Sequence, residues 1–554
     1  MIIDPTKIES DRELDFDICI IGSGAAGISM ALDFIDTKFK VALITGGNEK
    51  ETSVNKDLYK GFVPVEGNHE ALEENRRRQF GGSTAVWGGR CVPFDAIDFE
   101  YRPWLPNSGW PIIEDELKLH ISKALDLCDA GDFNFDARKV FTNTQSEIIE
   151  TLDNEDIYSW PLERYSTPTR FATKFKKTLK EAKNITVFLN THVTKINVSD
   201  KNPSKIDRVF TITGKKKNAF KAKHFILATG GIENARLLLA SRSITQPNGL
   251  GNNYDNVGRY YMCHLKGTFS KVIPRDRQNL LYTFERDANG VYCRRRWWIS
   301  PEAQLKNEIG NIIFFLDRPL DGLGEKDPVF SVFYTAKMFR ELLKQKSPKL
   351  IVKKLKSVKS ILLLHFKTSI KYGVMVLPEI IKLLKIRLNR RRLPEILPPK
   401  NAKSFHLYFQ SEHLPNRESR IRLSAEKDAN GVPRPSVSIK FTEQDVDTIV
   451  KAHKIFVDRF KEMNLGQIYF DEEALRNYIN DRIKNFDSAA HHLGTTRMAN
   501  NPEDGVVDAN CKVHGLTNIY IAGSSVFPTG SHANPTLMIV ALALRLSNHI
   551  KNLG

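Results

Sequence analysis

The feature that most constrains the fold lies near the start of the chain, where residues 17–34 read DICIIGSGAAGISMALDF. The apolar run Ile18–Ile21 is partly β-branched, which suits a strand buried within a parallel sheet. Gly22, Gly24 and Gly27 then form the pattern GxGxxG, and good helix formers follow. A second apolar run, KVALIT, comes after the helix. The stretch therefore predicts a strand–turn–helix–strand unit that binds a dinucleotide.

Each glycine of this pattern has its own physical purpose. Gly22 permits the tight turn, Gly24 lets the backbone approach a pyrophosphate, and Gly27 lets the helix pack closely on the strand. The N-terminus of the helix then faces the phosphates, because its unpaired N–H groups and its dipole favour negative charge.

One part of the nucleotide fingerprint is missing. An acidic residue at the end of the second strand would bind a ribose hydroxyl, but that place holds Thr45, followed by two glycines. Asn48 and Glu49 are candidates to replace the acid, and the ribose contact stays unassigned at this point.

Three later stretches carry similar signals. FGGSTAVWGGRCVPFD, at 80–95, places four glycines around a tryptophan, which is typical of a loop whose backbone lies flat against a neighbour. HFILATGGIENARLLLAS, at 224–241, and the segment 518–550 each read as an apolar strand, a turn of small residues and a helix. Because such pieces occur at the start, middle and end of the chain, they predict one discontinuous nucleotide-binding domain and a second domain between them.

These motifs resemble those of the glucose–methanol–choline (GMC) family of FAD-dependent alcohol oxidoreductases. The resemblance rests on GxGxxG at 22–27, GGST…WGG at 81–89, ATGGIENARLLL at 228–239, HxxGTxRM at 491–498 and NPT at 534–536. Two more stretches, 98–112 and 411–424, look like a bacterial branch related to pyranose oxidase and fructose dehydrogenase. The resemblance implies an α/β fold in which a Rossmann-like FAD-binding domain joins a substrate domain with an antiparallel sheet covered by helices.

The resemblance also implies a division of the chain. The expected parts are 12–110 (FAD-binding, with the flavin loop), 111–170 (lid or cap), 171–265 (FAD-binding), 266–480 (substrate domain, with a basic helical insert at 337–400) and 481–554 (FAD-binding, with the catalytic motif).

The residues expected to contact FAD come from all three parts of the nucleotide-binding domain. They are Gly22, Ser23, Gly24, Ala26, Gly27, Gly82, Ser83, Thr84, Trp87, Gly88, Val193, Gly523, Ser524, Asn534, Pro535 and Thr536. Pyranose-oxidase-like members carry a histidine immediately before the loop tryptophan, and some attach the flavin through it. Here Val86 stands at that place, so we expect FAD to be bound non-covalently.

Alcohol oxidation needs a base for the hydroxyl proton and an acceptor for the hydride, and flavin N5 is the acceptor. The family places the base three residues before a Gly-Thr pair. In SAAHHLGTTRM that residue is His491. The neighbouring His492 is then expected to point elsewhere and to make a structural hydrogen bond to the backbone.

The partner of the base is expected in GSHANPT. The residue that matches the family's His or Asn is Asn534, and His532 is the second candidate. An amide both donates and accepts, so it can hold the substrate oxygen without acting as a second base. Pro535 and Thr536 open the last helix, whose N-terminus would stabilise negative charge on the N1–C2=O side of the flavin.

The absence of targeting signals and the pattern of cysteines indicate where in the cell the protein is expected. The N-terminus lacks the basic and apolar regions of a signal peptide, and no run approaches the roughly 18 apolar residues of a membrane span. Six cysteines are scattered without metal-ligand spacing. We therefore expect reduced thiols, no metal site and a cytoplasmic location.

The positive charge is concentrated in one segment. The chain carries +17, and residues 337–400 account for +15 through 18 Lys or Arg against three acids. Apolar residues recur there at helical spacing, which predicts a basic amphipathic helical pair. One interpretation is a solvated helical cap whose apolar stripe packs on the substrate domain or on a dimer partner. The others are docking on the anionic inner surface of a membrane and binding of another polyanion. No nucleic-acid-binding module is recognisable, so we expect no nucleic-acid partner.

The sequence as a whole predicts FAD-dependent oxidation of an alcohol group of a sugar or polyol. Oxygen, a quinone or a carrier protein remains open as the electron acceptor. The alternatives are a membrane-surface dehydrogenase acting on a lipid-linked or non-sugar alcohol, a flavin monooxygenase, a nicotinamide dehydrogenase and a non-catalytic scaffold. A monooxygenase is disfavoured because no second GxGxxG is present for a reductant. The C-terminal strand and the motifs HxxGT and NPT disfavour a nicotinamide dehydrogenase, and the retained His491 and glycines disfavour a scaffold.

Overall fold

The computed structural model describes residues 1–3, 8–317, 402–485 and 491–553, together with individual residues between 328 and 395. Most of the predicted basic helical insert therefore lies outside the described residues. None of the helices in the described ranges combines the length and the apolar character that a membrane span requires.

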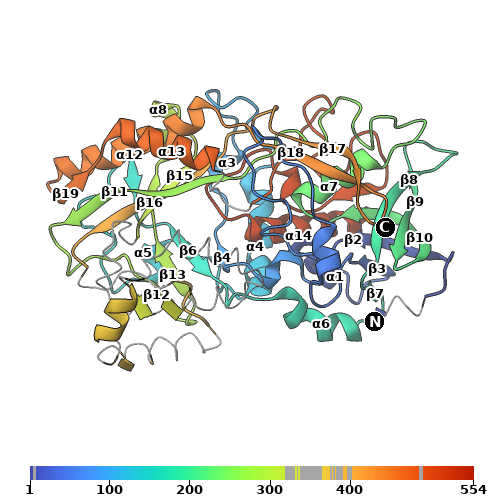
Figure 1. Cartoon of the computed structure of the whole chain (residues 1–554), viewed down its shortest axis with the longest axis horizontal. Helices are drawn as coiled ribbons and strands as arrows, with labels where there is room; N and C mark the ends of the chain where they lie inside the picture. The colour runs from blue at the N-terminus through green and yellow to red at the C-terminus, as the bar shows by residue number, and fades with distance from the viewer. Residues whose placement is uncertain are drawn as a thin grey trace.

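A largely parallel sheet forms the nucleotide-binding half of the molecule, on the right in Figure 1. Its central strand β2 (Glu13–Ile21) pairs in parallel with β3 (Val41–Ile44) and β10 (Lys216–Leu227). The apolar ends of these strands are fully buried, because neighbouring layers cover both faces. Further strands of this sheet are β1 (Ile2–Ile3), β7 (Ile185–Phe188), β8 (His192–Val198), β9 (Ile206–Thr213) and β20 (Ile519–Ile521).

Helices from distant parts of the chain pack together on this sheet. The helix after the glycine turn, α1 (Ala25–Asp33), contacts the last helix, α14 (Thr536–Leu553), and α14 contacts α4 (Glu114–Cys128) (Figure 1). β20 also pairs directly with β10. The start, middle and end of the chain therefore share one core, as the discontinuous pattern of motifs predicts.

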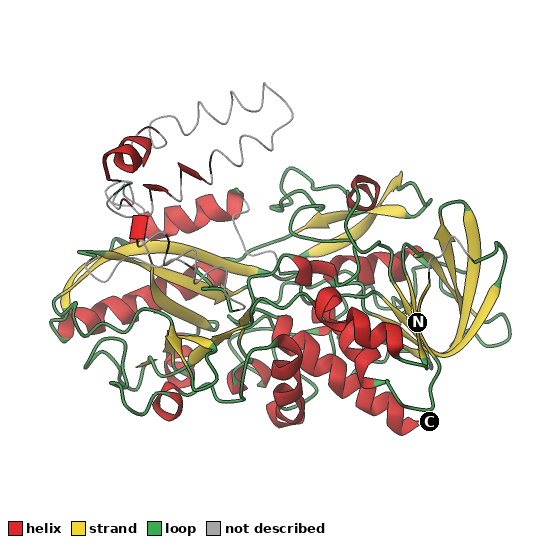
Figure 2. Cartoon of the chain, turned by 90° about the horizontal axis from the view of Figure 1, so that it is seen from below, coloured by secondary structure: helices red, strands yellow, loops and turns green. Residues whose placement is uncertain are grey.

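A six-stranded antiparallel sheet lies in the other half of the molecule (Figures 1 and 2). In order across the sheet its strands are β19 (Gly466–Tyr469), β11 (His264–Pro274), β16 (Phe405–Glu412), β15 (Ile312–Asp317), β14 (Trp297–Ile299) and β5 (Ile157–Tyr158). The helix α12 (Glu443–Glu462) packs on it, with Phe456 4.9 Å from Trp297 between ring centroids. The expected antiparallel sheet covered by helices is confirmed.

Smaller elements connect the two halves. A four-stranded sheet contains β12 (Glu285–Arg286), β13 (Tyr292–Arg295), β6 (Leu162–Tyr165) and β4 (Arg90–Cys91). The hairpin β17 (Arg420–Lys427) and β18 (Pro433–Ser438) packs on α7 (Gly231–Ala240) of the nucleotide-binding half, although it falls inside the range 266–480. Likewise β5 and β6 fall inside the range 111–170, but β5 pairs with β14 of the six-stranded sheet and β6 with β13 of the four-stranded sheet. The exact domain boundaries stay predictions.

The remaining regular elements are short or lie at the edges. They are α2 (Ser53–Asp57), η2 (Gly82–Ala85), α3 (Ala96–Phe99), α5 (Ala137–Val140), α6 (Phe171–Glu181), α8 (Pro301–Asn307), α13 (Glu472–Lys484) and η4 (Ser524–Val526). All six cysteines are buried and none forms a disulfide, which agrees with the expected reduced thiols.

Candidate active site

A cavity of about 420 Å³ lies at the carboxyl ends of the parallel strands, where residues directly after β2, β3, β10 and β20 line it. This is the edge at which open α/β sheets bind nucleotides. The expected site residues that line the cavity are Gly22, Ser23, Gly24, Ala26, Gly82, Ser83, Thr84, Trp87, Gly88, Val193, His491, Gly523, Ser524, Asn534, Pro535 and Thr536.

The glycine turn after β2 leaves room for a ligand. Gly22 has φ +110°, and a Cβ there would lie 2.3 Å from the Ala228 carbonyl oxygen. A Cβ at Gly24 would meet no atom within 4 Å, so this face of the turn is open to the cavity. Gly27 does not line the cavity among the described residues, but a Cβ there would lie 1.8 Å from the Gly22 carbonyl oxygen. Gly27 therefore serves close packing.

The flavin loop lies against this turn. A Cβ at Gly82 would come within 3.0 Å of the Gly24 Cα, and the Trp87 indole donates a hydrogen bond to the Thr169 carbonyl at 2.8 Å. Val86, which precedes the tryptophan, is 52% exposed and carries no nucleophilic atom. Its side chain therefore cannot form a covalent bond to a flavin.

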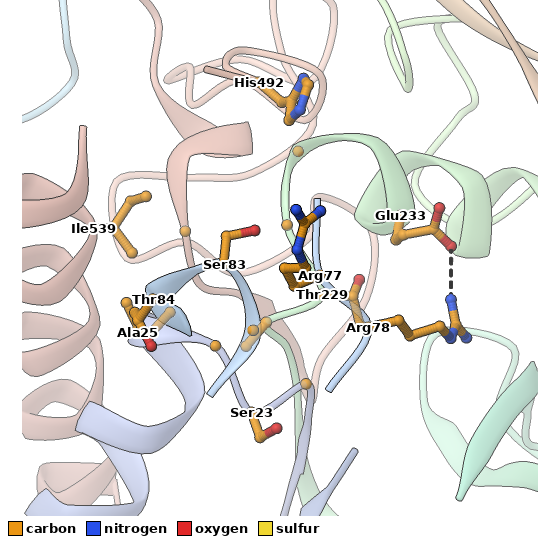
Figure 3. Close-up of a pocket in the computed structure, with 18 of the residues that line it drawn as sticks. Ser23, Ala25, Arg77, Arg78, Ser83, Thr84, Thr229, Glu233, His492 and Ile539 are labelled. Atoms are coloured by element: carbon orange, nitrogen blue, oxygen red, sulfur yellow. Dashed lines mark ion pairs between the residues drawn. The ribbon is translucent and has the colours of Figure 1, made fainter. Parts of the chain in front are cut away.

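A cationic side chain stands where the ribose-binding acid is expected. A Cβ at Gly46, just after β3, would lie 3.1 Å from both Nε and Nη2 of Arg78. Arg78 lines the cavity and pairs with Glu233 at 3.6 Å, as Figure 3 shows. Its Nε is buried and has no hydrogen-bond partner in the described part of the chain. An unpaired buried donor of this kind is suited to a hydroxyl of a bound nucleotide.

The two substitutes named from the sequence lie elsewhere. Glu49 forms an ion pair with Lys176 at 2.6 Å, and the Asn48 side chain accepts a hydrogen bond from the Glu49 backbone N–H. Neither belongs to the described residues that line the cavity. The interpretation that one of them replaces the acid is therefore not supported. The run RRRQF precedes the flavin loop in the sequence, but only the fold distinguishes Arg78 from the two arginines before it.

His491 and Asn534 meet at the other end of the cavity. Nε2 of His491 lies 3.4 Å from Nδ2 of Asn534, and its Nδ1 lies 2.9 Å from Nδ1 of His264. Burial, and next the neighbouring His264, lower the pKa of His491 well below its usual value. The ring is therefore neutral and has a lone pair with which to accept a proton.

His492 has a different partner from the one expected. Its Nδ1 hydrogen-bonds the Tyr261 hydroxyl, which also bonds Nε2 of His69 at 2.8 Å. The expected partner was the backbone, and this part of the prediction is wrong. The side chain also borders the cavity (Figure 3). Its Nδ1 is held by Tyr261, whereas both ring nitrogens of His491 face other partners.

His532 lies outside the cavity. It is fully buried, its Nε2 lies 2.9 Å from an Asp95 oxygen, and the Arg296 guanidinium contacts its ring. Burial, and next Arg296, lower its pKa to about 4. Of the two partners considered for the base, Asn534 is the one that the fold brings to His491.

Comparison with known proteins places the motifs in a family. Residues 415–543 match the family described as GMC oxidoreductase, and residues 16–238 match the one described as pyridine nucleotide-disulphide oxidoreductase. The chain carries a GMC oxidoreductase domain.

The chain shares segments with several oxidoreductases whose names include sugar substrates. It is 27% identical to the fructose dehydrogenase large subunit of Gluconobacter japonicus over 31% of this chain and 29% of that protein. It is 34% identical to 6'''-hydroxyparomomycin C oxidase of Streptomyces lividus over 24% of this chain and 23% of that protein. It is 28% identical to pyranose 2-oxidase of Tricholoma matsutake over 24% of this chain and 22% of that protein. These matches span less than a third of each relative, so they support a shared domain rather than a shared activity.

Solved structures extend the likeness in fold to almost the whole chain. Pyridoxine 4-oxidase from Mesorbium loti superposes with a TM-score of 0.55 at 15% identity, covering 97% of this chain and 99% of that one. Formate oxidase gives a TM-score of 0.55 at 14% identity, covering 99% of each. At these identities the likeness establishes the fold alone.

Three further side chains around the pair formed by His491 and Asn534 were not singled out from the sequence. His264 and Gln410 belong to β11 and β16, outside the motifs quoted above, and Arg90, in β4, directly follows the last glycine of the flavin loop. Arg90 lines the cavity, and its guanidinium donates to the Gln410 side-chain oxygen at 3.1 Å. Only the pairing of strands brings these side chains to the site.

Proposed function

We propose that this protein oxidises a CH–OH group of a sugar or polyol with FAD as the bound cofactor. The observation that carries the proposal is the contact of His491 with Asn534 at 3.4 Å, in the same cavity as the open glycine turn. A proton acceptor and a dinucleotide cradle thus share one enclosed space, which a redox reaction at a hydroxyl-bearing carbon requires.

The residues around the cavity fit FAD. The open face at Gly24 admits a pyrophosphate, and the N-termini of α1 and α14 both border the cavity, where they favour negative charge. When bound, FAD supplies the hydride acceptor. We propose that its attachment is non-covalent, because Val86 offers no nucleophile beside Trp87.

His491 takes the hydroxyl proton in this proposal. Burial keeps its ring neutral before reaction, so Nε2 is free to accept. The Asn534 amide, 3.4 Å from that nitrogen, holds the substrate oxygen beside it. Hydrogen-bond reach to the hydroxyl is the condition that a general base must meet.

A sugar or polyol is the substrate class that we favour. Fructose dehydrogenase, pyranose 2-oxidase and C-glycoside 3-oxidase are among the similar proteins. Arg90 adds a hydrogen-bond donor to the cavity wall near the base, and such donors suit hydroxyl-rich ligands. Oxygen, a quinone and a carrier protein are all compatible electron acceptors.

Anaerobic spectroscopy tests the proposal. The purified protein should show flavin absorbance, release the flavin on denaturation, and lose the oxidised-flavin band when one member of a panel of sugars and polyols is added. His491→Ala should retain flavin but slow this reduction by roughly 100-fold or more. His453→Leu, a buried histidine in α12 remote from the cavity, is the matched control.

Two outcomes would contradict the proposal. A folded preparation without any flavin absorbance would remove the cofactor assignment. Unimpaired flavin reduction in His491→Ala would move the proton acceptor to another group that lines the cavity, first of all His492.

A further inference from the structure

The orientation of the Gln410 side-chain amide is fixed by two hydrogen-bond partners, one of which can only donate and the other only accept. Its oxygen accepts hydrogen bonds from the Arg90 guanidinium and the Tyr408 hydroxyl, each at 3.1 Å. Its nitrogen donates to the backbone carbonyl of His532. An arginine cannot accept and a carbonyl cannot donate, so the NH2 group of Gln410 must face His532.

That orientation determines the next side chain. Nε2 of Gln410 also lies 3.3 Å from Oδ1 of Asn534. Because the Gln410 nitrogen is a donor, Asn534 must present its oxygen to Gln410. The Asn534 amide nitrogen then faces Nε2 of His491 at 3.4 Å, and this nitrogen can only donate.

These contacts determine which ring nitrogen of His491 carries the hydrogen. Nε2 of His491 faces a donor, so it carries the lone pair, and the single hydrogen of the neutral ring is on Nδ1. That nitrogen lies 2.9 Å from Nδ1 of His264, which must therefore accept the hydrogen bond. His264 in turn carries its own hydrogen on Nε2.

We propose that Gln410 and His264 are positioning residues that hold His491 in the tautomer with hydrogen on Nδ1 and the lone pair on Nε2. The consequence for chemistry rests on the proposed function, because Nε2 is the atom that would accept the substrate proton. The tautomer itself is a property of the protein and does not depend on the substrate.

The positions of the two residues suit this role. Gln410 lies opposite Lys266, and His264 lies opposite Glu412, in the pairing of β16 with β11. His264 and Gln410 thus stand on the same face of neighbouring strands. They are 0% and 2% exposed, so water does not compete for their hydrogen bonds. Residues of the antiparallel sheet therefore determine which ring nitrogen of His491 carries the hydrogen, although His491 itself belongs to the nucleotide-binding half.

His264 also keeps its accepting nitrogen over a wide pH range. Burial, and next the nearby His532 and Arg90, lower its pKa to about 3. It therefore stays neutral at any pH at which an enzyme of this kind is assayed. The opposite tautomer of His491 would set its Nε2–H against the Asn534 NH2 group, so that two donors would face each other.

Nitrogen NMR of the full chain with 15N-labelled histidine tests the tautomer directly, without substrate. The resonances of His491 are those that His491→Gln removes. We expect a protonated Nδ1 and an unprotonated Nε2. A protonated Nε2 would overturn the proposal, even if the protein proved to oxidise no sugar at all.

Gln410→Glu tests the role of the glutamine in the same experiment. A carboxylate places an acceptor where the Gln410 nitrogen donates, so Asn534 should turn and present its oxygen to His491. The hydrogen of His491 should then move to Nε2. An unchanged tautomer in the folded variant would exclude Gln410 as the residue that sets it.

The role of His264 is tested by removing and restoring its accepting nitrogen. His264→Leu should slow the limiting rate of flavin reduction by roughly 100-fold, with KM changed less than twofold and flavin content unchanged. His264→Asn keeps an acceptor near the Nδ1 position and should recover most of that rate. His453→Leu, equally buried but remote from the cavity, controls for the loss of a core histidine.

Two results would contradict the role of His264. One is a His264→Leu variant that reduces its flavin at the wild-type rate. The other is a folded His264→Asn variant as slow as His264→Leu. If no substrate reduces even the wild-type flavin, the proposed function fails, and the NMR experiment still decides the tautomer.

Discussion

Arg78 holds the place that an acidic residue takes in the usual nucleotide fingerprint. Its guanidinium lies within 3.1 Å of where a Gly46 Cβ would be, and its Nε is unpaired among the described residues. A buried hydrogen bond from a charged donor contributes about 1.5–3 kcal/mol. We therefore expect Arg78→Ala to weaken FAD binding by roughly 10- to 100-fold, measured by flavin fluorescence during titration of the apoprotein.

The control for Arg78 is an arginine that has no contact with the cavity. Arg422, exposed on β17, is such a residue, and Arg422→Ala should leave the FAD dissociation constant unchanged. Equal FAD affinity in Arg78→Ala and the wild type would show that the ribose end is held by other groups.

In the strand–turn–helix element, Gly27 is needed for the packing of the helix, whereas Gly24 leaves room for a ligand. A Cβ at Gly27 would lie 1.8 Å from the Gly22 carbonyl oxygen, so Gly27→Ala must push α1 away from the turn. We expect a loss of about 1–3 kcal/mol in the free energy of unfolding. Urea denaturation of the apoprotein measures it, and an unchanged midpoint would contradict the packing role of Gly27.

Gly24→Ala makes the matched comparison within the same element. Its Cβ would meet no atom of the protein within 4 Å but would project into the cavity. Stability should therefore change by less than about 1 kcal/mol, while FAD affinity falls. The reverse order of effects at the two glycines would mean that the turn does not cradle a phosphate.

The whole molecule buries several histidines in neutral form. Burial is the largest cause that lowers the pKa of His192 and His264 to about 3 and of His453 and His532 to about 4. Below about pH 6.5 these side chains gain protons only in the unfolded chain, so acid favours unfolding. Three carboxyls act the opposite way, because burial raises the pKa of Asp98 to about 8 and that of Asp153 to about 6, and also raises the pKa of Asp445.

Burial also lowers the pKa of His69, His491 and His492. The buried histidines therefore outnumber the carboxyls with a raised pKa, which sets the sign of the pH dependence. We expect the free energy of unfolding of the holoprotein to fall as the pH is lowered from about 6.5 to about 4.5, by ~1.4 kcal/mol per pH unit for each net proton. Urea unfolding at several pH values measures the slope. His453→Leu should reduce the slope by about one proton, and a stability that rises on acidification would contradict the assignment.

Local patterns were sufficient to predict the nucleotide-binding half. The turn at Gly22, the close packing at Gly27 and the apolar strands are dictated by steric and burial rules that act within about 30 residues. The spacing H-x-x-G-T likewise singled out His491, and NPT singled out Asn534, because each motif is contiguous in the chain. The helix-covered antiparallel sheet was expected only because the motifs resemble those of the GMC family.

The protonation of the site was decided by tertiary structure alone. His264, Gln410 and Arg90 come to the pair formed by His491 and Asn534 because β11, β16 and β4 pair with strands distant in sequence, and no local pattern records that register. The same holds for Arg78, which lies beside the end of β3 only after the loop before Gly81 folds back. The sequence by itself determined which residue is the candidate base, and the packing of two sheets determined which of its nitrogens can accept a proton.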